Sequence, residues 1–253
     1  MKSRQSALTL ILPAYNEAKT ISSTLLEVTE YFRSRGYPYE IIVSADGDDG
    51  TRELALKFAL SHPEVQVIGD SVRRGKGRGI REAVKIASGS IIGFADADNK
   101  VPIEEFQKIE PWFGCGFDIV IGSRALAASQ VEQKQKWYRR VGARGFYYFM
   151  HSVVGLPGIE DTQCGFKFFQ REVARDLFSR QRVDGYMFDI EVLALAQLSS
   201  HRIKEVPIRW HDDADSRLQL LSGNIRNVID IFRIRSYCRQ QGRTHARILP
   251  RVT

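Results

Sequence analysis

Two aspartates that stand one residue apart carry the clearest chemical signal in the sequence, within the string Phe94-Ala95-Asp96-Ala97-Asp98. They follow an apolar segment, Ser90–Ala95. Carboxylate oxygens are hard ligands, and proteins hold Mg²⁺ or Mn²⁺ through one or two carboxylates together with substrate phosphates. A turn with two solvated acids, or a helix N-cap, would explain the same string. Asp96 and Asp98 are therefore candidate ligands of a divalent cation.

A second cluster combines cations with glycines in residues 73–79 (RRGKGRG), ahead of a predicted helix. Backbone N–H groups at a helix start, with a cation such as Lys76 beside them, suit a diphosphate. A flexible basic surface loop explains these residues equally well. The segment is not the phosphate-binding loop of NTPases, because it lacks the pattern G-x-x-x-x-G-K-[ST].

A third cluster, LPAYNE at residues 12–17, ends the first predicted strand. The Tyr15 ring can stack on a base, and the Glu17 carboxylate can accept hydrogen bonds from a base or a ribose. Asn16 is a plausible N-cap for the helix that follows.

The elements that must position these clusters alternate between strands and helices over the first hundred residues. Apolar runs predict strands at Leu8–Pro13, Glu40–Ala45, Val65–Gly69 and Ser90–Ala95, and helices at Glu17–Arg35, Thr51–Leu60 and Gly79–Ala87. Strands separated by single helices predict an α/β protein, with a mostly parallel central sheet and helices on both faces. In such sheets ligands bind at the carboxyl ends of the strands, where every polar cluster of this region falls.

Beyond a strand at Phe117–Gly122 the alternation becomes less regular. The later pattern predicts strands at Gly165–Phe169 and His201–Trp210, and helices at Arg171–Ser179, Phe188–Ser199 and Leu218–Cys238. The last helix has an apolar stripe between arginines.

Composition limits the classes of protein that fit. With 253 residues, 43% of them hydrophobic and 26% charged, the chain suits one large domain. Its three cysteines form no CxxC or Cys/His cluster, which favours a reducing cytoplasm over a zinc site or a disulfide framework. Residues 224–253 hold seven arginines and one acid, so most of the net charge of +7 lies there. The body is nearly neutral, which argues against a general nucleic-acid binder.

Two segments bear on membranes. The longest uncharged stretch, residues 145–159, has 15 residues, fewer than the ~18 that span a bilayer. The N-terminal apolar run ends at Pro13, so it is read as a strand and not as a signal peptide. The aromatic segment 145–156 and the basic end of the chain suit an anionic membrane surface, although a core helix and a solvated tail are the alternatives. These features predict a cytoplasmic protein that is peripheral on the inner face of a membrane.

Taken together, the motifs resemble family 2 glycosyltransferases of GT-A fold over residues 8 to about 220. Within that family they are most similar to dolichyl-phosphate β-glucosyltransferases, with dolichyl-phosphate mannosyltransferases next. The matching strings are LPAYNE (12–17), RGKGRGIR (74–81), ADAD (95–98), GSR (122–124), DTQCGFKFF (161–169), MFDIE (187–191) and VPIRW (206–210). The resemblance implies a single GT-A domain at 1–220, with a nucleotide-sugar half (1–122) and an acceptor half (123–220). A basic amphipathic helix and tail (221–253) follow.

The resemblance also implies roles for individual residues. Those that bind the nucleotide-sugar would be Pro13, Tyr15, Glu17, Asp46, Lys76, Asp96 and Arg217, with Asp46 chosen because the family's motif after the second strand is shifted here. Those that grip the acceptor phosphate would be Arg124 with Arg139 or Arg140. Asp96 and Asp98 would hold Mg²⁺ or Mn²⁺. His211 is a possible third ligand, but a structural histidine is the more common case, and Lys100 replaces a glutamine that can ligate the metal in the mannosyltransferases.

The expected reaction is inverting transfer of a hexose from a nucleotide-sugar to a polyprenyl or dolichyl phosphate. UDP-glucose is favoured as donor and GDP-mannose is next. A phosphate monoester has a second pKa of ~6, so it is already a dianion that needs arginine and not a strong base. A hydroxyl acceptor would need a general base, for which Asp161 is the candidate.

Three alternatives remain open. The first is a glycosyltransferase with a soluble phosphorylated or hydroxyl acceptor. The second is a nucleotidyltransferase that forms nucleotide-sugars, although such enzymes need a Gly-rich basic signature where this chain has LPAYNE. The third is a non-catalytic GT-A binding domain, which the presence of Asp96, Asp98, Arg124 and Asp161 together disfavours.

Overall fold

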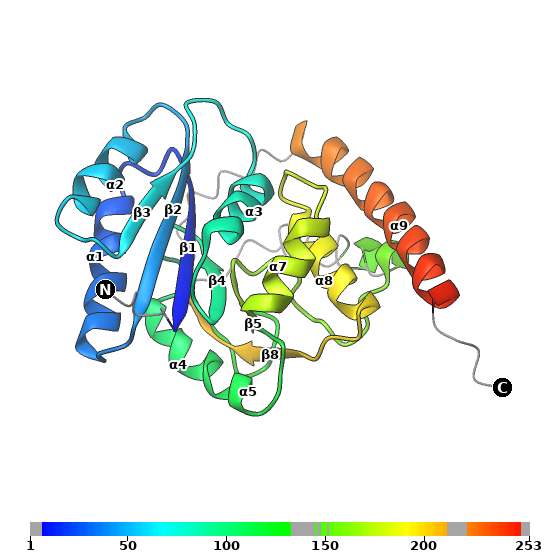
Figure 1. Ribbon diagram of the computed structural model, residues 1–253. Helices are drawn as coiled ribbons and strands as arrows, with labels where there is room; N and C mark the ends of the chain where they lie inside the picture. Colours follow the sequence, from blue (N-terminus) through cyan, green and yellow to red (C-terminus); the bar gives the residue numbers. More distant parts are fainter. Residues whose placement is uncertain (1–6, 133–144, 146–147, 151, 212–221, 249–253) are drawn as a thin grey trace.

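The computed structural model describes residues 7–132, 145, 148–150, 152–211 and 222–248. Within these ranges a seven-stranded sheet has the order β3-β2-β1-β4-β7-β5-β8 (Figure 1). Its strands are β1 (Leu8–Tyr15), β2 (Tyr39–Asp46), β3 (Val65–Ile68), β4 (Ile91–Ala95), β5 (Ile119–Ser123), β7 (Phe166–Gln170) and β8 (Ile203–Pro207). All neighbouring pairs are parallel except those of β7, which runs antiparallel to β4 and β5. The predicted α/β class with a mostly parallel sheet is confirmed.

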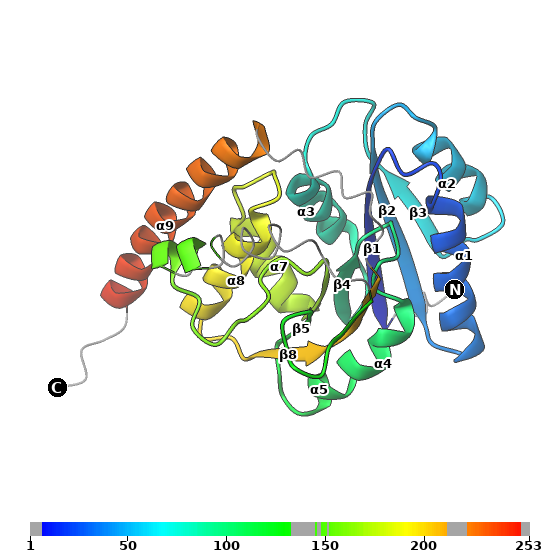
Figure 2. The same cartoon turned by 180° about the vertical axis from the view of Figure 1, so that it is seen from behind.

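Alternation of apolar side chains along the strands explains why both faces of the sheet are covered. In β1, Leu8, Leu10 and Leu12 belong to one buried cluster, whereas Ile11 belongs to the other. The first face carries α1 (Ile21–Ser34), α2 (Thr51–Ala59), η1 (Ile103–Glu105), α4 (Phe106–Ile109) and α5 (Pro111–Gly114). The second face carries α3 (Lys76–Ile86), α7 (Arg171–Arg180) and α8 (Phe188–Leu198), as Figures 1 and 2 show from opposite sides. The sheet is therefore buried on both faces, as parallel sheets usually are.

The start of α1 differs from the prediction. The helix begins at Ile21 and not at Glu17, because the backbone N–H groups of Thr20 and Ile21 both donate to the carbonyl oxygen of Glu17 in a preceding turn. Asn16 has a φ of 56° and Thr20 is the N-cap residue, with no side-chain cap bond. The predicted N-cap role of Asn16 is therefore wrong: Asn16 makes the chain turn at the end of β1.

Two other elements differ from the predicted boundaries. α3 begins at Lys76 and not at Gly79, which puts Lys76 in its first turn. The predicted strand His201–Trp210 is two strands, β8 and β9 (Arg209–His211). Beyond Pro207 the chain leaves the main sheet, and β9 pairs with β6 (Gln130–Glu132) in a separate two-stranded sheet.

The C-terminal helix α9 (Ser222–Ile248) is longer than predicted and packs on α8 at the outer edge of the second face. Of the helices in the described ranges, none has the length and apolar character that a membrane crossing requires. Most of the segment 133–147, and with it Arg139 and Arg140, lies outside the described residues, as does Arg217.

Candidate active site

Asp96 and Asp98, the predicted ligands of a divalent cation and hereafter the metal motif, lie directly after β4, near the centre of the sheet. The Asp96 backbone N–H donates to the carbonyl oxygen of Gly165 (3.1 Å), and its carboxylate Oδ1 lies 2.5 Å from Nζ of Lys76. Asp98 Oδ2 lies 2.8 Å from Nζ of Lys100. Each carboxylate thus has a lysine beside it. Both remain reachable from solvent, since the Asp96 and Asp98 side chains are 42% and 28% exposed.

Gly165, at the start of β7, leaves the space that the Asp96 side chain occupies. A Cβ atom at this position would lie 2.0 Å from Oδ2 of Asp96, closer than any real contact. The antiparallel strand therefore presses against the metal motif, and only glycine permits the observed carboxylate position. Gly165 thus leaves room for the Asp96 carboxylate. This role was not predicted from the sequence, although Gly165 lies within the DTQCGFKFF string.

The oxygen donors of this site fit a divalent cation whose remaining ligands come from substrate. Across the described residues no three His, Cys, Asp or Glu side chains gather into a metal-binding group. Two carboxylates plus substrate phosphates are a common way for proteins to hold Mg²⁺. The backbone N–H of His211 donates to the carbonyl oxygen of Lys100 (2.9 Å), which places β9 beside the motif. A metal-ligating role for His211 stays a prediction.

Lys76 is positioned by the glycine loop at the beginning of α3. Gly75 has a φ of 111°, in the region that favours glycine, and a Cβ atom there would collide with the carbonyl oxygen of Asp184. The lysine side chain is 17% exposed. Burial lowers its pKa, but the nearby carboxylates of Asp96 and Asp189 outweigh burial and raise the pKa above the ordinary value. These two carboxylates therefore favour the charged form of Lys76.

The nucleoside candidates meet at the carboxyl ends of β1 and β2. Tyr15 and Asp46 are register partners across these strands, and Pro13 lies two residues earlier in β1. The guanidinium carbon of Arg73 lies 4.2 Å from the centroid of the Tyr15 ring, and Nη2 of Arg73 donates to the hydroxyl of Tyr186 (3.0 Å). Two tyrosine rings and an arginine are thus in contact beside the carboxyl end of β1. Tyr186 was not predicted, and no motif in the sequence points to it.

Asp46 and Glu17 make contacts that hold the loops of this region together. The Asp46 carboxylate accepts backbone N–H bonds from Arg74 (2.8 Å) and Asp70 (3.3 Å), which ties the end of β2 to the basic glycine loop. The Glu17 backbone N–H donates to Oγ1 of Thr51 (2.8 Å), and its carboxylate accepts from Oγ1 of Thr20 (3.2 Å). Direct nucleoside contacts by Asp46 and Glu17 stay predictions.

Arg124 and Asp161, for which the sequence predicts roles at the acceptor, form an ion pair. Arg124 follows β5, and its Nε and Nη2 atoms donate to the two carboxylate oxygens of Asp161 at 2.7 and 2.9 Å. Asp161 also accepts the backbone N–H groups of Arg124 (3.0 Å) and Gln163 (3.2 Å). Burial raises the pKa of Asp161, but Arg124 and these hydrogen bonds outweigh it and hold that pKa below its ordinary value. The carboxylate is an ionised acceptor whose lone pairs are already used.

A second charged pair, Lys167 with Asp189, lies deeper in the protein. Nζ of Lys167 is 2.7 Å from Oδ1 of Asp189, and the two side chains are 1% and 5% exposed. Lys167 also donates to the carbonyl oxygen of Cys164, and Asp189 adds to the negative field around Lys76. Both residues belong to strings with family resemblance, DTQCGFKFF and MFDIE, but their pairing was not predicted. Lys76, Asp96, Lys167 and Asp189 thus interact with one another, and burial raises the pKa of Asp189 although Lys167 and Lys76 oppose that rise.

Comparisons with known proteins identify the family of the chain. The model of the family named Glycosyl transferase family 2 matches residues 9–178. A dolichyl-phosphate beta-glucosyltransferase of Trichomonas vaginalis is 35% identical over 242 residues, which cover 91% of this chain and 71% of the relative. The human dolichyl-phosphate beta-glucosyltransferase is 32% identical over 226 residues, or 83% of this chain and 69% of the relative.

Solved structures share the fold at lower sequence identity. Glucosyl-3-phosphoglycerate synthase of Mycobacterium tuberculosis, crystallised with Mn²⁺, UDP and phosphoglyceric acid, has a TM-score of 0.66 and 22% identity, covering 94% of this chain and 80% of that one. Mannosyl-3-phosphoglycerate synthase of Rubrobacter xylanophilus has a TM-score of 0.69 and 18% identity, covering 94% and 76%. The predicted GT-A fold is confirmed. The family match over residues 9–178 and the identity to these relatives establish that the chain belongs to glycosyl transferase family 2.

Proposed function

We propose that the protein transfers glucose from UDP-glucose to dolichyl phosphate, or a related polyprenyl phosphate, with inversion at the anomeric carbon. The observation that carries this proposal is the Arg124–Asp161 pair, seen together with relatives that are named dolichyl-phosphate beta-glucosyltransferases. Direct attack by an acceptor oxygen on an α-linked donor gives a β-linked product.

The donor would lie across the carboxyl ends of β1, β2 and β4. Tyr15 and Arg73 offer surfaces for the base, and Lys76 faces the place where Asp96 and Asp98 would hold Mg²⁺ or Mn²⁺ with the diphosphate. A bound cation would neutralise the charge that develops on the leaving nucleoside diphosphate. Lys76, held cationic by its neighbours, contributes to the same stabilisation and orients the diphosphate beside the carboxylates.

The acceptor would be anionic because the chemistry around Arg124 suits a phosphate. Asp161 is a poor general base: its pKa is lowered and its oxygens already accept four hydrogen bonds. A phosphate dianion needs no base, but it needs a fixed guanidinium. Asp161 fixes Arg124 through two of its side-chain nitrogens, and the Arg124 side chain is still 32% exposed. Arg139 and Arg140 would add to this site, and Arg217 would close on the donor.

A lipid-linked acceptor also implies that the protein works at a membrane surface. We place it peripherally, on the cytoplasmic face of the membrane that holds the acceptor. The basic composition of residues 224–253 supports this placement.

The direct test is transfer of radiolabel from UDP-glucose, in the presence of Mn²⁺ or Mg²⁺, to dolichyl phosphate. Dolichol, which has the same lipid without the phosphate, is the matched control, and GDP-mannose is the competing donor. We expect label in the organic phase with dolichyl phosphate only, and at least tenfold more from UDP-glucose than from GDP-mannose. Equal labelling of dolichol, or no labelling of dolichyl phosphate by either donor, would contradict the proposal.

A further inference from the structure

The outward face of α9 carries an apolar stripe that remains largely exposed, with a contact to Phe149 at its Phe232 end. Ile225, Ile229 and Phe232 recur at the spacing of one helical face, and they are 70%, 46% and 50% exposed. Val228, beside them, is 36% exposed. Large apolar side chains that gather on one exposed face usually mark a contact surface.

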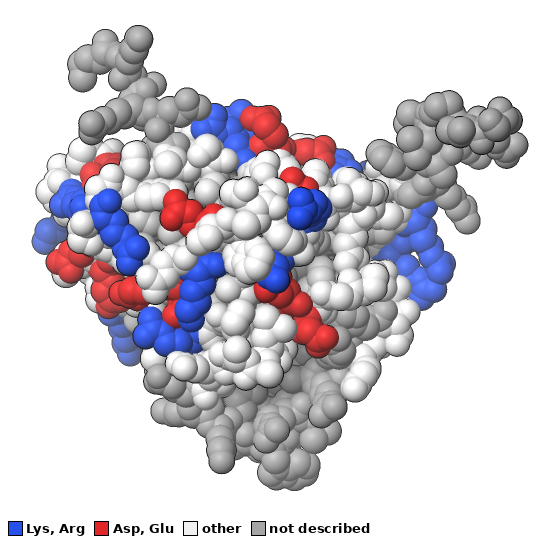
Figure 3. All heavy atoms as spheres, turned by 90° about the horizontal axis from the view of Figure 1, so that it is seen from below, with Lys and Arg blue, Asp and Glu red and all other residues white. Residues whose placement is uncertain are grey.

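Arginines flank the stripe on both sides. Arg226 and Arg233 lie on the side of the helix that borders the cavity with residues 182–185, and Arg235 and Arg239 lie on the other side. The side chain of Arg233 is 72% exposed. Asp230, the acid of this segment, belongs to the inward face and is 6% exposed. In Figure 3 basic side chains gather at the edge of the molecule on the side where α9 lies.

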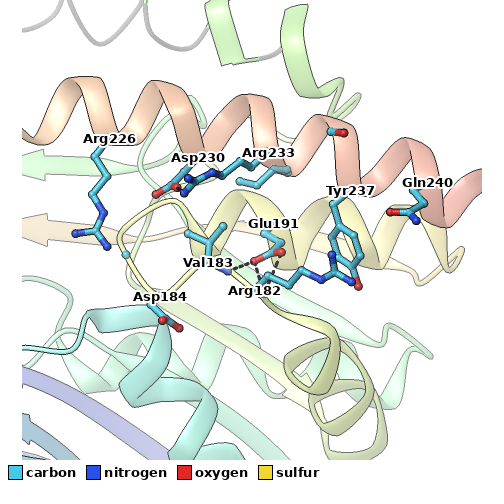
Figure 4. A pocket seen from close by; sticks show the side chains of 12 residues that line it. Arg182, Val183, Asp184, Glu191, Arg226, Asp230, Arg233, Tyr237 and Gln240 are labelled. Carbon is cyan, nitrogen blue, oxygen red and sulfur yellow. Dashed lines mark hydrogen bonds and ion pairs between the residues drawn. The ribbon is translucent and has the colours of Figure 1, made fainter.

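The opposite face of α9 packs against the body of the protein. Ile231, Ile234 and Tyr237 are buried, and the Tyr237 hydroxyl donates to the carbonyl oxygen of Arg180 (3.2 Å). The guanidinium carbon of Arg182 lies 3.8 Å from the centroid of the Tyr237 ring (Figure 4). A cavity of about 430 Å³, lined on one side by α9 and on the other by residues 182–185, adjoins these contacts. These buried contacts hold α9 on the body of the protein, and the apolar stripe lies on the opposite face of the helix.

A second segment extends the apolar surface. The Phe149 ring contacts that of Phe232 edge to face, with 6.1 Å between centroids, while Met150 is buried and Tyr148 is 57% exposed. Phe149 therefore extends the aromatic part of this surface. Aromatic, aliphatic and arginine side chains in this arrangement are typical of helices that lie at the headgroup boundary of a bilayer.

We propose that this face, made of Ile225, Val228, Ile229, Phe232 and their flanking arginines, docks the protein on an anionic lipid surface. A second copy of the chain is the competing occupant. In a two-fold contact, however, the same patch faces itself, so the arginines of one copy would meet those of the other. Anionic headgroups complement those arginines, and acyl chains accept the apolar stripe. The choice of a membrane builds on the lipid acceptor of the proposed function.

One loop links the docking helix α9 to the candidate donor site. Residues 182–185 border α9 across the cavity, and the carbonyl oxygen of Asp184 accepts the backbone N–H of Arg78 (3.3 Å). Arg81 Nη2 also lies 2.7 Å from the Asp184 carboxylate. The loop thus connects the proposed docking helix with the glycine loop that positions Lys76.

The test is co-sedimentation of the full chain with phosphatidylcholine vesicles that contain about one third phosphatidylserine. We expect binding that falls at least tenfold in 0.5 M salt, because exposed charges are screened. The double variant Ile225→Asp/Ile229→Asp should lose at least tenfold in vesicle affinity. Arg226→Gln/Arg239→Gln should lose about tenfold or more on anionic vesicles and little on neutral ones.

Matched control variants test whether exposed apolar or basic residues elsewhere on the protein have the same effect as those of α9. Leu60→Asp changes an 89% exposed apolar residue beyond α2, and Lys19→Gln/Lys57→Gln removes two exposed cations elsewhere. Both controls should bind vesicles like the unchanged protein, and circular dichroism verifies that all variants fold. Equal binding of the α9 variants and the unchanged protein would overturn the proposal. So would the absence of binding to anionic vesicles at any salt, or a concentration-dependent dimer that Ile225→Asp/Ile229→Asp abolishes.

Activity on a water-soluble, short-chain prenyl phosphate distinguishes this proposal from the proposed function. The α9 variants should keep that activity within about twofold while they lose activity on dolichyl phosphate in vesicles. If the unchanged protein binds vesicles but glucosylates neither acceptor, the proposed function fails and the docking surface stands.

Discussion

The two sides of the candidate active site are built in different ways. On the donor side, Tyr15, Asp46 and Asp96 lie at the ends of parallel strands, and backbone geometry brings them to one edge of the sheet. On the other side, built around β5 and β7, Arg124 forms an ion pair with Asp161, and Lys167 forms one with Asp189 deeper in the protein.

For the residues of β7, this difference follows from the direction of the strand. The carboxyl ends of parallel strands meet at one edge of the sheet. A polar residue that directly follows any of these strands therefore lies near the site. β7 runs the other way, and its beginning, not its end, meets the metal motif. Lys167 of β7 is held in place by its ion pair with Asp189, and Gly165, just before β7, packs closely against Asp96. Variants on the two sides should therefore fail in different ways: donor-side changes lose chemistry, and acceptor-side changes also lose stability or alignment.

The largest effect on activity is expected for Asp98→Asn. Loss of one charged metal ligand should lower kcat/KM about 10²–10³-fold, while the denaturation midpoint stays close to that of the unchanged protein. Steady-state transfer from UDP-glucose measures the first quantity and urea unfolding the second. Asp176→Asn, a change in an exposed i,i+4 pair with Arg180, is the control and should leave activity intact. A large loss of stability in Asp98→Asn would break the contrast between the two sides.

On the other side, Asp189→Ala should mainly destabilise the protein. It leaves the buried ammonium of Lys167 without its carboxylate, which costs about 3–5 kcal/mol of unfolding free energy. Replacing both partners, in Lys167→Met/Asp189→Leu, should recover much of that loss. Glu82→Ala, which breaks a surface pair with Lys85, should change stability by less than about 1 kcal/mol. If Asp189→Ala unfolds at the same urea concentration as the unchanged protein, the pair is not a structural support.

Gly165→Ala tests the steric contact between the two sides. The added methyl would displace the Asp96 carboxylate, so we expect kcat/KM to fall by about 10–100-fold, as misplaced catalytic groups generally cause. The apparent affinity for Mn²⁺ in the presence of UDP should fall as well. Gly114→Ala is the matched control, because an added Cβ there meets no atom within 4 Å. Unchanged Mn²⁺ affinity in Gly165→Ala would show that Gly165 does not influence metal binding at Asp96.

Asp161→Asn is expected to have the smallest effect on activity, about tenfold, because Asp161 positions Arg124 and does not take a proton. The lowered pKa of Asp161 keeps it ionised at all pH values above its ordinary pKa of about 4. Activity should instead rise with pH near ~6, as the acceptor phosphate becomes a dianion. That rise should persist in Asp161→Asn. Its disappearance, or complete loss of activity in a folded variant, would identify Asp161 as a general base and favour a hydroxyl acceptor.

Much of the donor side could be predicted from the sequence because its signals are local. Apolar runs of four to eight residues locate the parallel strands, and the polar residues that follow them give Asp96, Asp98 and Lys76. Helix starts were less well predicted: α3 begins at Lys76 because Gly75 adopts a positive φ, which the sequence allows but does not require.

The acceptor side could be predicted only in part, because its contacts are not local. Arg124 and Asp161 were identified by family resemblance, but their bidentate pairing depends on how β5 and the segment before β7 meet in space. The pairing of Lys167 with Asp189 depends on the antiparallel insertion of β7, which no periodicity reveals. The division of β8 from β9 follows from pairing with β6, which is likewise a tertiary effect.

The most direct test of the donor site is a calorimetric titration of Mn²⁺ with and without UDP. Two carboxylates alone make an incomplete site, so Mn²⁺ should bind weakly to the free protein and at least tenfold more tightly once UDP supplies its phosphates. Asp98→Asn should abolish that coupling. Equally tight Mn²⁺ binding without UDP, or coupling that survives in Asp98→Asn, would contradict a donor site built on Asp96 and Asp98.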